Sequence, residues 1–144
     1  MPDAVFTLDR KNEFLGQLDF LILAAPLSPA TRGMVGESEL KALPPKAFLL
    51  NPARGPLVQE RALLRALEEG WIAGAALDTH FQYPMPPDHP LWRFPNVLLT
   101  PHISGSSLSP FFLPRVWDLF RQNTRRFLHG EPLLNELARD QLTA

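Results

Sequence analysis

The chain alternates short apolar runs with polar or amphipathic segments. Four runs stand out, at residues 19–25, 47–51, 72–78 and 96–102. Each is only a few residues long, and each ends at a polar residue or is followed by proline. A continuous run such as 19–25 is typical of a strand covered on both faces of its sheet. The pattern therefore predicts four buried strands.

Three other segments have the spacing of helices. A short helix is expected to begin near Glu37 or Ser38 and to stop at the proline pair that follows it. In segment 59–69, the small and apolar residues fall on one helical face, and Gly70 supplies a stop. The residues of that face are Ala62, Leu63, Ala66 and Leu67. Segment 109–128 predicts a long amphipathic helix, with Phe112, Val116, Phe120 and Phe127 at helical spacing.

Strands that alternate with helices or loops indicate an α/β fold with a mostly parallel sheet flanked by helices. In open α/β sheets, ligands lie just outside the carboxyl ends of the strands. Four residues lie at or just past such ends: Pro26, Arg54, Asp78 and His102. We therefore expect one cation, one carboxylate and one imidazole to converge on a single edge of the sheet.

Composition narrows the classes of function. The length of 144 residues fits one ordinary domain, and the formal net charge of −1 argues against nucleic acid or an anionic membrane as the main partner. No apolar run could span a bilayer, and the N-terminus lacks a signal-peptide pattern, so a cytoplasmic location is expected. Cysteine is absent and no histidine–carboxylate spacing suits a metal, so we predict no metal site.

The residues at the strand ends each allow two interpretations. Arg54 could bind a carboxylate with its planar fork, or it could form a structural salt bridge to Asp78 or Glu60. Asp78 could accept hydrogen bonds from a ligand, or it could cap the next turn. His102 suits proton transfer near neutral pH, although a lone histidine is often structural.

The remaining histidines are less suggestive of function. His89 is expected to order a proline-rich loop and His129 to be exposed, and no specific expectation is attached to His80. The stretch around His102 also allows a serine hydrolase that uses Ser104 or Ser106. The strand–Gly-x-Ser-x-Gly–helix elbow of such enzymes is missing from this stretch.

Four motifs, taken in order, resemble the D-isomer-specific 2-hydroxyacid dehydrogenases, and in particular glyoxylate/hydroxypyruvate reductases. They are "APLSPATRGMVG", "LLNPARGPLVQERALLRALEEGWIAGAALD", "HPLWRFPNVLLTPHISG" and "GEPLLN". The resemblance covers about residues 18–135. It implies reduction of a small 2-keto acid with NAD or NADP.

The resemblance also implies a role for each candidate residue. Arg54 would hold the substrate carboxylate and polarise the keto group, and His102 would donate the proton. Asp78 would contact the nicotinamide carboxamide. The other residues expected along the cofactor are Pro26, Thr31, Pro52, Ala53 and Gly105.

The sequence departs from the family pattern in two ways. Tyr83 stands where the family usually has the glutamate that pairs with the catalytic histidine, so Tyr83 is the third candidate catalytic residue. A phenol can hydrogen-bond His102, but as a neutral group it does not stabilise imidazolium as a carboxylate does. In addition, residues 1–19 lack the glycine-rich turn that binds the pyrophosphate.

The second departure suggests how the chain is organised. Residues 1–108 are interpreted as the distal half of a Rossmann-type domain, and residues 109–144 as the C-terminal helix and tail. The chain would be either a fragment of a longer product or a shortened protein, and its uncovered apolar faces would favour a homo-oligomer.

Three functions therefore remain open. The leading one is a truncated 2-hydroxyacid dehydrogenase, for which the cofactor alternatives are NAD, NADP or none. The first alternative is a non-redox module that oligomerises or binds a partner. The second is a promiscuous esterase-type hydrolase that uses His102 and a nearby serine.

Overall fold

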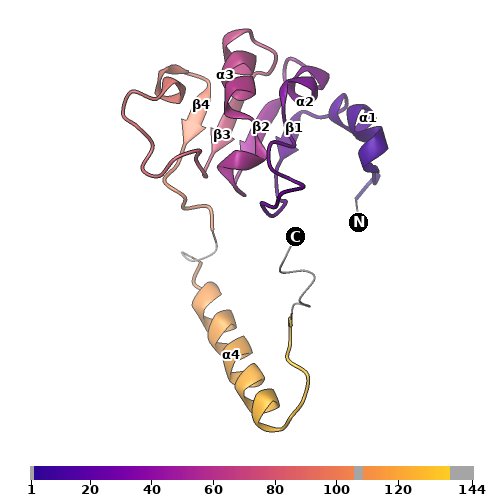
Figure 1. Cartoon of the computed structure of the whole chain (residues 1–144), viewed down its shortest axis with the longest axis vertical. Coiled ribbons are helices and arrows are strands. Elements are labelled where there is room, and N and C mark those ends of the chain that lie inside the picture. The colour runs from indigo at the N-terminus through magenta and orange to yellow at the C-terminus, as the bar shows by residue number, and fades with distance from the viewer. Residues whose placement is uncertain (1, 106–108, 137–144) are drawn as a thin grey trace. The chain divides into compact units, whose positions relative to one another are not determined.

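The computed structural model describes residues 2–105 and 109–136, and it divides into two compact units, Met1–His102 and Ile103–Ala144. Ser106, one of the two candidate nucleophiles, lies outside the described residues. Each unit is described by itself below. Figure 1 labels the helices and strands of both units.

The first unit is built on a four-stranded sheet in which all neighbouring strands are parallel. The strands are β1 (Phe20–Ile22), β2 (Phe48–Asn51), β3 (Gly74–Leu77) and β4 (Val97–Leu99), and their order in the sheet is β1-β2-β3-β4. Helices connect β1 to β2 and β2 to β3, a loop with a 3-10 turn connects β3 to β4, and the carboxyl ends of the strands lie along one edge (Figure 1). The predicted α/β fold with a parallel sheet is confirmed.

Short helices join and precede the strands. They are α1 (Lys11–Leu15), α2 (Glu37–Ala42) and α3 (Glu60–Glu68), together with 3-10 turns at Leu8–Arg10, Gly55–Leu57 and Pro90–Arg93. The helices α2 and α3 begin within a residue of their predicted starts. The sequence pattern did not predict α1, because five residues are too few for an apolar periodicity.

The predicted apolar face of α3 forms part of the core. Ala62, Leu63, Ala66 and Leu67 are all buried, against strand residues such as Leu49 and Leu77. Burial of these side chains is the main source of stability here, since a fully buried leucine contributes roughly 2 kcal/mol. Gly70 follows the helix with a φ of 71°, which glycine adopts without strain.

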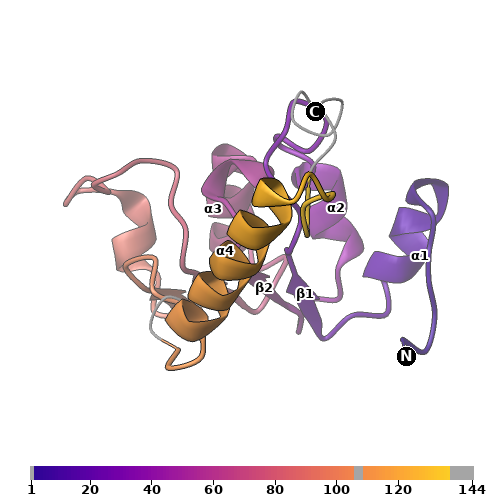
Figure 2. The same cartoon turned by 90° about the horizontal axis from the view of Figure 1, so that it is seen from below.

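The opposite face of the sheet is bare in the described structure. Phe20, Ile22 and Leu98 keep 60%, 59% and 62% of their surface exposed. Figure 2 shows α2 and α3 together on one side of β1 and β2. Consecutive right-handed crossovers in one direction place their helices on one face. The expectation that β1 is covered on both faces is therefore wrong for this structure.

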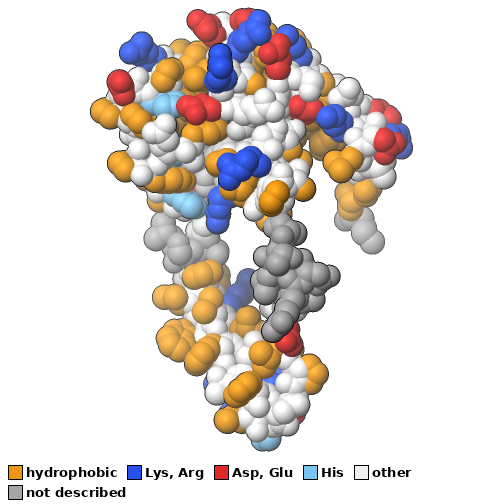
Figure 3. Space-filling model, in the orientation of Figure 1, with side chains coloured by type: hydrophobic (Ala, Val, Ile, Leu, Met, Phe, Trp, Pro, Cys, Tyr) orange, Lys and Arg blue, Asp and Glu red, His pale blue; other side chains and the backbone are white. Residues whose placement is uncertain are grey.

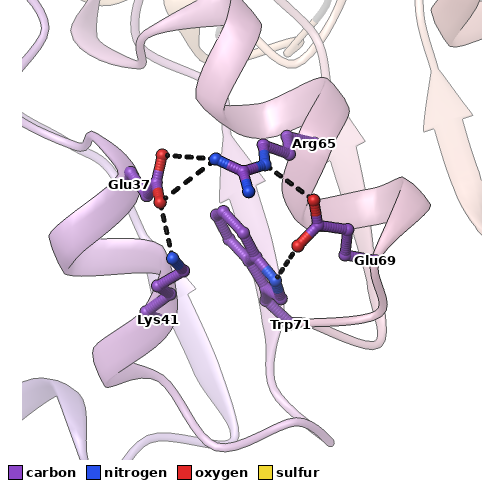
Figure 4. A network of polar contacts seen from close by, with 5 residues as sticks. All are labelled: Glu37, Lys41, Arg65, Glu69 and Trp71. Atoms are coloured by element: carbon purple, nitrogen blue, oxygen red, sulfur yellow. Dashed lines mark hydrogen bonds and ion pairs between the residues drawn. The ribbon is translucent and has the colours of Figure 1, made fainter.

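A network of charged side chains joins α2 to α3 (Figure 4). Glu37 pairs with Lys41 at 2.5 Å and with Arg65 at 3.2 Å, and Arg65 pairs with Glu69 at 2.6 Å. The indole of Trp71 donates to Glu69, and the ammonium of Lys41 lies 4.3 Å from the ring centre. These charges gather over α2 and α3 on the surface seen in Figure 3.

A buried carboxylate joins α1 to the start of α2. Glu39 accepts a hydrogen bond from the Lys11 ammonium at 2.5 Å and another from the Gly36 amide at 2.9 Å. Burial alone acts to raise the pKa of Glu39, but these hydrogen bonds outweigh it and lower the pKa to about 2. Glu39 is therefore ionised at neutral pH although only 8% of its surface is exposed.

The second unit contains α4 (Phe112–Leu128), which confirms the predicted long helix. The segment that follows the helix is bonded back to its C-terminal half. The side-chain amide nitrogen of Asn123 donates to the Leu134 carbonyl, and the side-chain oxygen of Asn123 accepts from the Leu134 amide. Apolar side chains are exposed along α4 (Figure 3), with Phe120 at 62% and Phe127 at 74%. Within the described part of the chain, no helix combines the length and apolarity needed to cross a bilayer.

Candidate active site at the carboxyl ends of the strands

The turn after β2 is shaped by Asn51, the last residue of the strand. Its side chain is buried, and its amide nitrogen donates to the Arg54 carbonyl at 2.8 Å. Its oxygen accepts hydrogen bonds from the amides of Ala53 and Arg54, each at 3.2 Å. Asn51 thus holds the turn that carries Pro52, Ala53 and Arg54. Sequence reasoning did not select it, although a polar residue that closes a buried run is a usable signal.

Arg54 lies exposed at this turn. Its guanidinium donates to the neighbouring Ala53 carbonyl at 2.6 Å. Of its two candidate salt-bridge partners, Glu60 instead contacts His89 at 2.7 Å. The carboxylate of the other, Asp78, accepts a hydrogen bond from Thr100. Among the residues that the structure describes, no ion pair joins Arg54 to either carboxylate.

Gly55 brings the turn after β2 against the segment after β3. A β-carbon at this position would lie 2.3 Å from the His80 carbonyl oxygen and 2.9 Å from the Phe81 amide nitrogen. Only glycine permits so close an approach of the two backbones. The arginine–glycine pair therefore places Arg54 beside the loop that contains the other candidate residues.

Asp78 lies buried just past the end of β3. Its amide donates to the Asn51 carbonyl at 3.2 Å, so it continues the contact between β2 and β3. The Thr100 hydroxyl donates to its carboxylate from the segment after β4. Asp78 therefore joins three strand ends.

Tyr83 and His102 lie together, with His80 beside them. The Tyr83 hydroxyl is 3.4 Å from His102 Nδ1, and it accepts a hydrogen bond from the His80 amide at 2.9 Å. The His80 ring reaches the Thr100 carbonyl through Nε2 at 2.9 Å. His80, which the sequence marks as less suggestive of function, contributes its amide and its ring to this cluster.

His102 has an unusual backbone conformation. Its φ is 58°, in the left-handed region that few non-glycine residues occupy. Its amide donates to the Thr100 carbonyl at 2.9 Å across Pro101. Such a conformation costs on the order of 1–3 kcal/mol and is concentrated at functional sites.

A groove at the ends of β1 and β2 has a volume of about 460 Å³ and is lined by small or apolar residues and one cation. These are Ala24, Ala25, Pro26, Leu27, Ala53 and Arg54. Thr31 shapes its border, since the Thr31 hydroxyl donates to the Pro26 carbonyl at 2.7 Å and accepts from the Ser28 amide at 2.8 Å. The groove can receive a flat ring while it keeps a positive charge nearby.

The other sequence-selected residues lie as follows. Pro52 is exposed in the turn after β2. Gly105 and Ser104 are exposed and belong to the second unit. His89 orders its proline-rich loop by accepting from the Leu91 amide, and His129 is exposed, both as predicted. No group of three potential metal ligands occurs among the described residues.

The structure thus joins Asp78 to Thr100, Tyr83 to His102, and Gly55 to the His80 backbone. Within residues 2–105 and 109–136, no hydrogen bond or ion pair connects Arg54 with His102. A guanidinium and an imidazole nevertheless lie past the ends of β2 and β4, at the same edge of one parallel sheet. This is the edge at which open α/β sheets, including those that bind dinucleotides, hold their ligands.

Comparison with known proteins gives the family. The model of the D-isomer specific 2-hydroxyacid dehydrogenase NAD binding domain matches residues 2–104, and the chain belongs to this family. A glyoxylate reductase of Thermofilum pendens is 42% identical over 131 residues, which make up 91% of this chain and 38% of that protein. A glyoxylate/hydroxypyruvate reductase A of Photorhabdus laumondii is 36% identical over 85% of this chain and 38% of that protein.

Solved structures agree with these matches. A D-isomer specific 2-hydroxyacid dehydrogenase from Xanthobacter autotrophicus, in complex with NADPH and MES, is 38% identical with a TM-score of 0.84, over 93% of this chain and 42% of that one. An NADPH-dependent glyoxylate/hydroxypyruvate reductase from Sinorhizobium meliloti, in complex with NADP and sulfate, is 29% identical with a TM-score of 0.83, over 96% and 43%. The chain therefore spans about two fifths of the length of these relatives. These comparisons lend no support to the hydrolase or to the non-redox binding module.

Proposed function

We propose that this protein takes part in the NAD(P)H-dependent reduction of a small 2-keto acid, with glyoxylate and hydroxypyruvate as the first substrates to test. Family membership and the names of its relatives support this proposal. The observation that carries it is the convergence of Arg54 with the Tyr83–His102 pair at one sheet edge.

Arg54 is the proposed carboxylate-binding residue. A guanidinium presents two parallel N–H donors that match the two oxygens of a carboxylate. The turn held by Asn51 keeps its backbone in place, while its side chain is exposed to a ligand. The same positive charge stabilises the negative charge that develops on a neighbouring keto oxygen during reduction.

His102 is the proposed proton donor, and Tyr83 is the proposed third catalytic residue. The keto oxygen needs a proton as it becomes a hydroxyl group, and an imidazole nitrogen can supply it. Tyr83 contacts Nδ1, so Nε2 is the nitrogen left for the substrate.

The groove residues fit the nicotinamide end of the cofactor. Small side chains leave space for a flat ring at the strand ends, where α/β sheets bind nucleotides. We infer that Pro26, Thr31, Pro52, Ala53 and Gly105 lie along the cofactor and that Asp78 accepts from its carboxamide. When bound, the cofactor supplies the hydride.

Binding can be tested by titrating the chain with NADH and with NADPH. Energy transfer from the three tryptophans to the reduced nicotinamide reports the complex. Reduced nicotinamide mononucleotide, which lacks the adenosine half, is the matched probe for the groove alone. Saturable binding followed by glyoxylate- or hydroxypyruvate-dependent oxidation supports the proposal. No binding of any of these compounds up to millimolar concentration contradicts it.

The bare face of the sheet also supports the inference of a homo-oligomer. Phe20 stacks on Phe48 at the surface, with ring centres 5.9 Å apart, and a hollow of about 470 Å³ extends from them to Leu98. Exposed apolar patches of this kind mark interaction sites.

A further inference from the structure

The hydroxyl of Tyr83 lies between a donor and an acceptor. The His80 amide can only donate, so the Tyr83 oxygen accepts in that 2.9 Å contact. An oxygen that accepts one hydrogen bond becomes a stronger donor through its own hydrogen. The neighbouring atom at 3.4 Å is His102 Nδ1, which can accept in a neutral imidazole. This order of donors favours the tautomer of neutral His102 that carries its ring proton on Nε2.

The cluster is attached to two strand ends. The Thr100 carbonyl can only accept, so His80 Nε2 carries a proton and donates to it at 2.9 Å. The Tyr83 ring centre lies 5.6 Å from the His80 ring and 5.9 Å from the His102 ring. Gly55 fixes the His80 backbone from the β2 side. Tyr83 therefore approaches His102 from a held position.

Resting on the function proposed above, we propose that Tyr83 supplies the proton that His102 delivers to the keto acid. As the keto carbon gains the hydride from the reduced cofactor, the keto oxygen takes the proton from His102 Nε2. Nδ1 takes the phenolic proton at the same time, so the imidazole stays neutral. After the product leaves, Nε2 of the exposed His102 takes a proton from solvent and Nδ1 returns its proton to the Tyr83 oxygen, which restores the starting tautomer. One hydride and one proton are added in each turnover.

This relay differs from a carboxylate-assisted histidine in its dependence on pH. A carboxylate beside His102 would act by stabilising imidazolium, and the reaction would slow as that form disappears. The relay starts from the neutral imidazole of His102. As the pH is raised, it remains possible for as long as Tyr83 keeps its phenolic proton. The titratable and charged groups around it are His80 on the same loop, Asp78 through Thr100, and Arg54 next to Gly55.

The position of the ring proton can be tested without turnover. In the full chain labelled with nitrogen-15, imidazole resonances report which nitrogen of neutral His102 is protonated and which accepts a hydrogen bond. We expect Nδ1 to be unprotonated, and its resonance to shift when Tyr83→Phe removes the hydroxyl. A proton on Nδ1 of neutral His102, or an unchanged Nδ1 resonance in Tyr83→Phe, would overturn the relay.

Kinetics with the 2-keto acid and NADH provide the second test. Tyr83→Phe is expected to lower kcat/KM about 100-fold, the usual scale of a lost acid, with unchanged NADH affinity. Between about pH 7.5 and 9, kcat/KM of the wild type should change less than about threefold, whereas Tyr83→Glu should lose about tenfold or more. Trp92→Phe is the matched control on the same loop, because it removes one hydrogen bond to Pro86 away from His102.

The outcomes separate the relay from the proposed function. If the wild type turns over and Tyr83→Phe keeps its rate, or if the profiles of wild type and Tyr83→Glu coincide, the relay is wrong and the reductase function stands. If the wild type reduces no keto acid at any pH, the reductase function fails for this chain, and the nitrogen resonances alone decide the Tyr83–His102 hydrogen bond.

Discussion

Arg54 gains its position from neighbours that do not touch a substrate. Asn51 holds the turn and Gly55 allows it to abut the next loop, so the guanidinium is aimed by backbone contacts. Arg54→Gln should lower kcat/KM for a 2-keto acid by about 10²–10³, because a charge that stabilises the developing oxyanion is lost. Arg54→Lys should give an intermediate loss, since it keeps the charge but loses the planar fork. Steady-state kinetics measure both.

The control for Arg54 is another exposed arginine of the same unit. Arg61→Gln on α3 should leave kcat/KM within about twofold of the wild type. An Arg54→Gln variant as active as Arg61→Gln would exclude Arg54 from substrate binding.

Asn51 should be important for stability as well as for the site. Asn51→Ala leaves the Arg54 carbonyl and two amides without their partner, and the loss of these three part-buried hydrogen bonds should cost about 1–2 kcal/mol. Urea unfolding measures the change. Asn96→Ala, which removes one exposed hydrogen bond to the Ala73 carbonyl, is the matched control and should cost less. Equal losses in the two variants would contradict the role given to Asn51.

Sequence reasoning found some of these residues and missed others for physical reasons. Arg54, Asp78 and His102 follow apolar runs, so the rule for strand ends selects them directly. Their catalytic and binding roles remain predictions. His80 could not be recognised, because its part in the cluster depends on its backbone amide and on which atoms the loop brings near Thr100. No pattern of side-chain types along the chain reports either.

At the scale of elements, apolar periodicity predicted those helices and strands whose positions are set by burial of their side chains. The inner face of α3 and the four strands along the chain follow from spacing, whereas the order of the strands in the sheet comes from the structure. The helix α1 was missed, because it is held by one leucine in the core and by the Lys11–Glu39 contact rather than by a repeated pattern. The continuous apolar run at 19–25 is typical of a strand that is covered on both faces of its sheet, yet only alternate residues of β1 are buried.

The stabilisation that Glu39 provides to the contact between α1 and α2 depends on pH. Its pKa is lowered from 4.5 to about 2 in the folded state, so its stabilising effect is complete above about pH 4.5 and is lost as the pH falls from there toward 2. Glu39→Gln should therefore have a lower free energy of unfolding than the wild type at pH 7. Its free energy of unfolding should also fall less than that of the wild type between pH 5 and 2. Thermal unfolding across this range measures the difference. Glu68→Gln, an exposed change on α3, should keep the acid dependence of the wild type.

If the stability of the wild type does not change between pH 5 and 2, or if the wild type and Glu39→Gln lose stability in parallel, the Glu39 carboxylate contributes little to the stability of the fold. The ion pairs around Trp71 provide a contrast, because their side chains are exposed and salt screens them.

At the scale of the whole molecule, the bare sheet face should cause self-association. Apolar side chains from three strands are exposed together there, so Phe20→Ser combined with Leu98→Thr should shift the chain toward monomer. Sedimentation velocity over a range of concentrations measures this shift. Val5→Thr, an exposed change away from the sheet, is the control and should leave the distribution of species unchanged. A double variant that sediments as the wild type does would contradict self-association through the bare sheet face.

The order of the strands has a consequence for synthesis on the ribosome. Each strand pairs with the one made just before it, and β4 forms the last edge. Within the described chain, no strand has to wait for a strand beyond the next one, so the sheet can be laid down one strand at a time as the chain emerges. The edge that carries Arg54 would then form before the segment that carries His102, and the candidate site would be completed only when β4 is added.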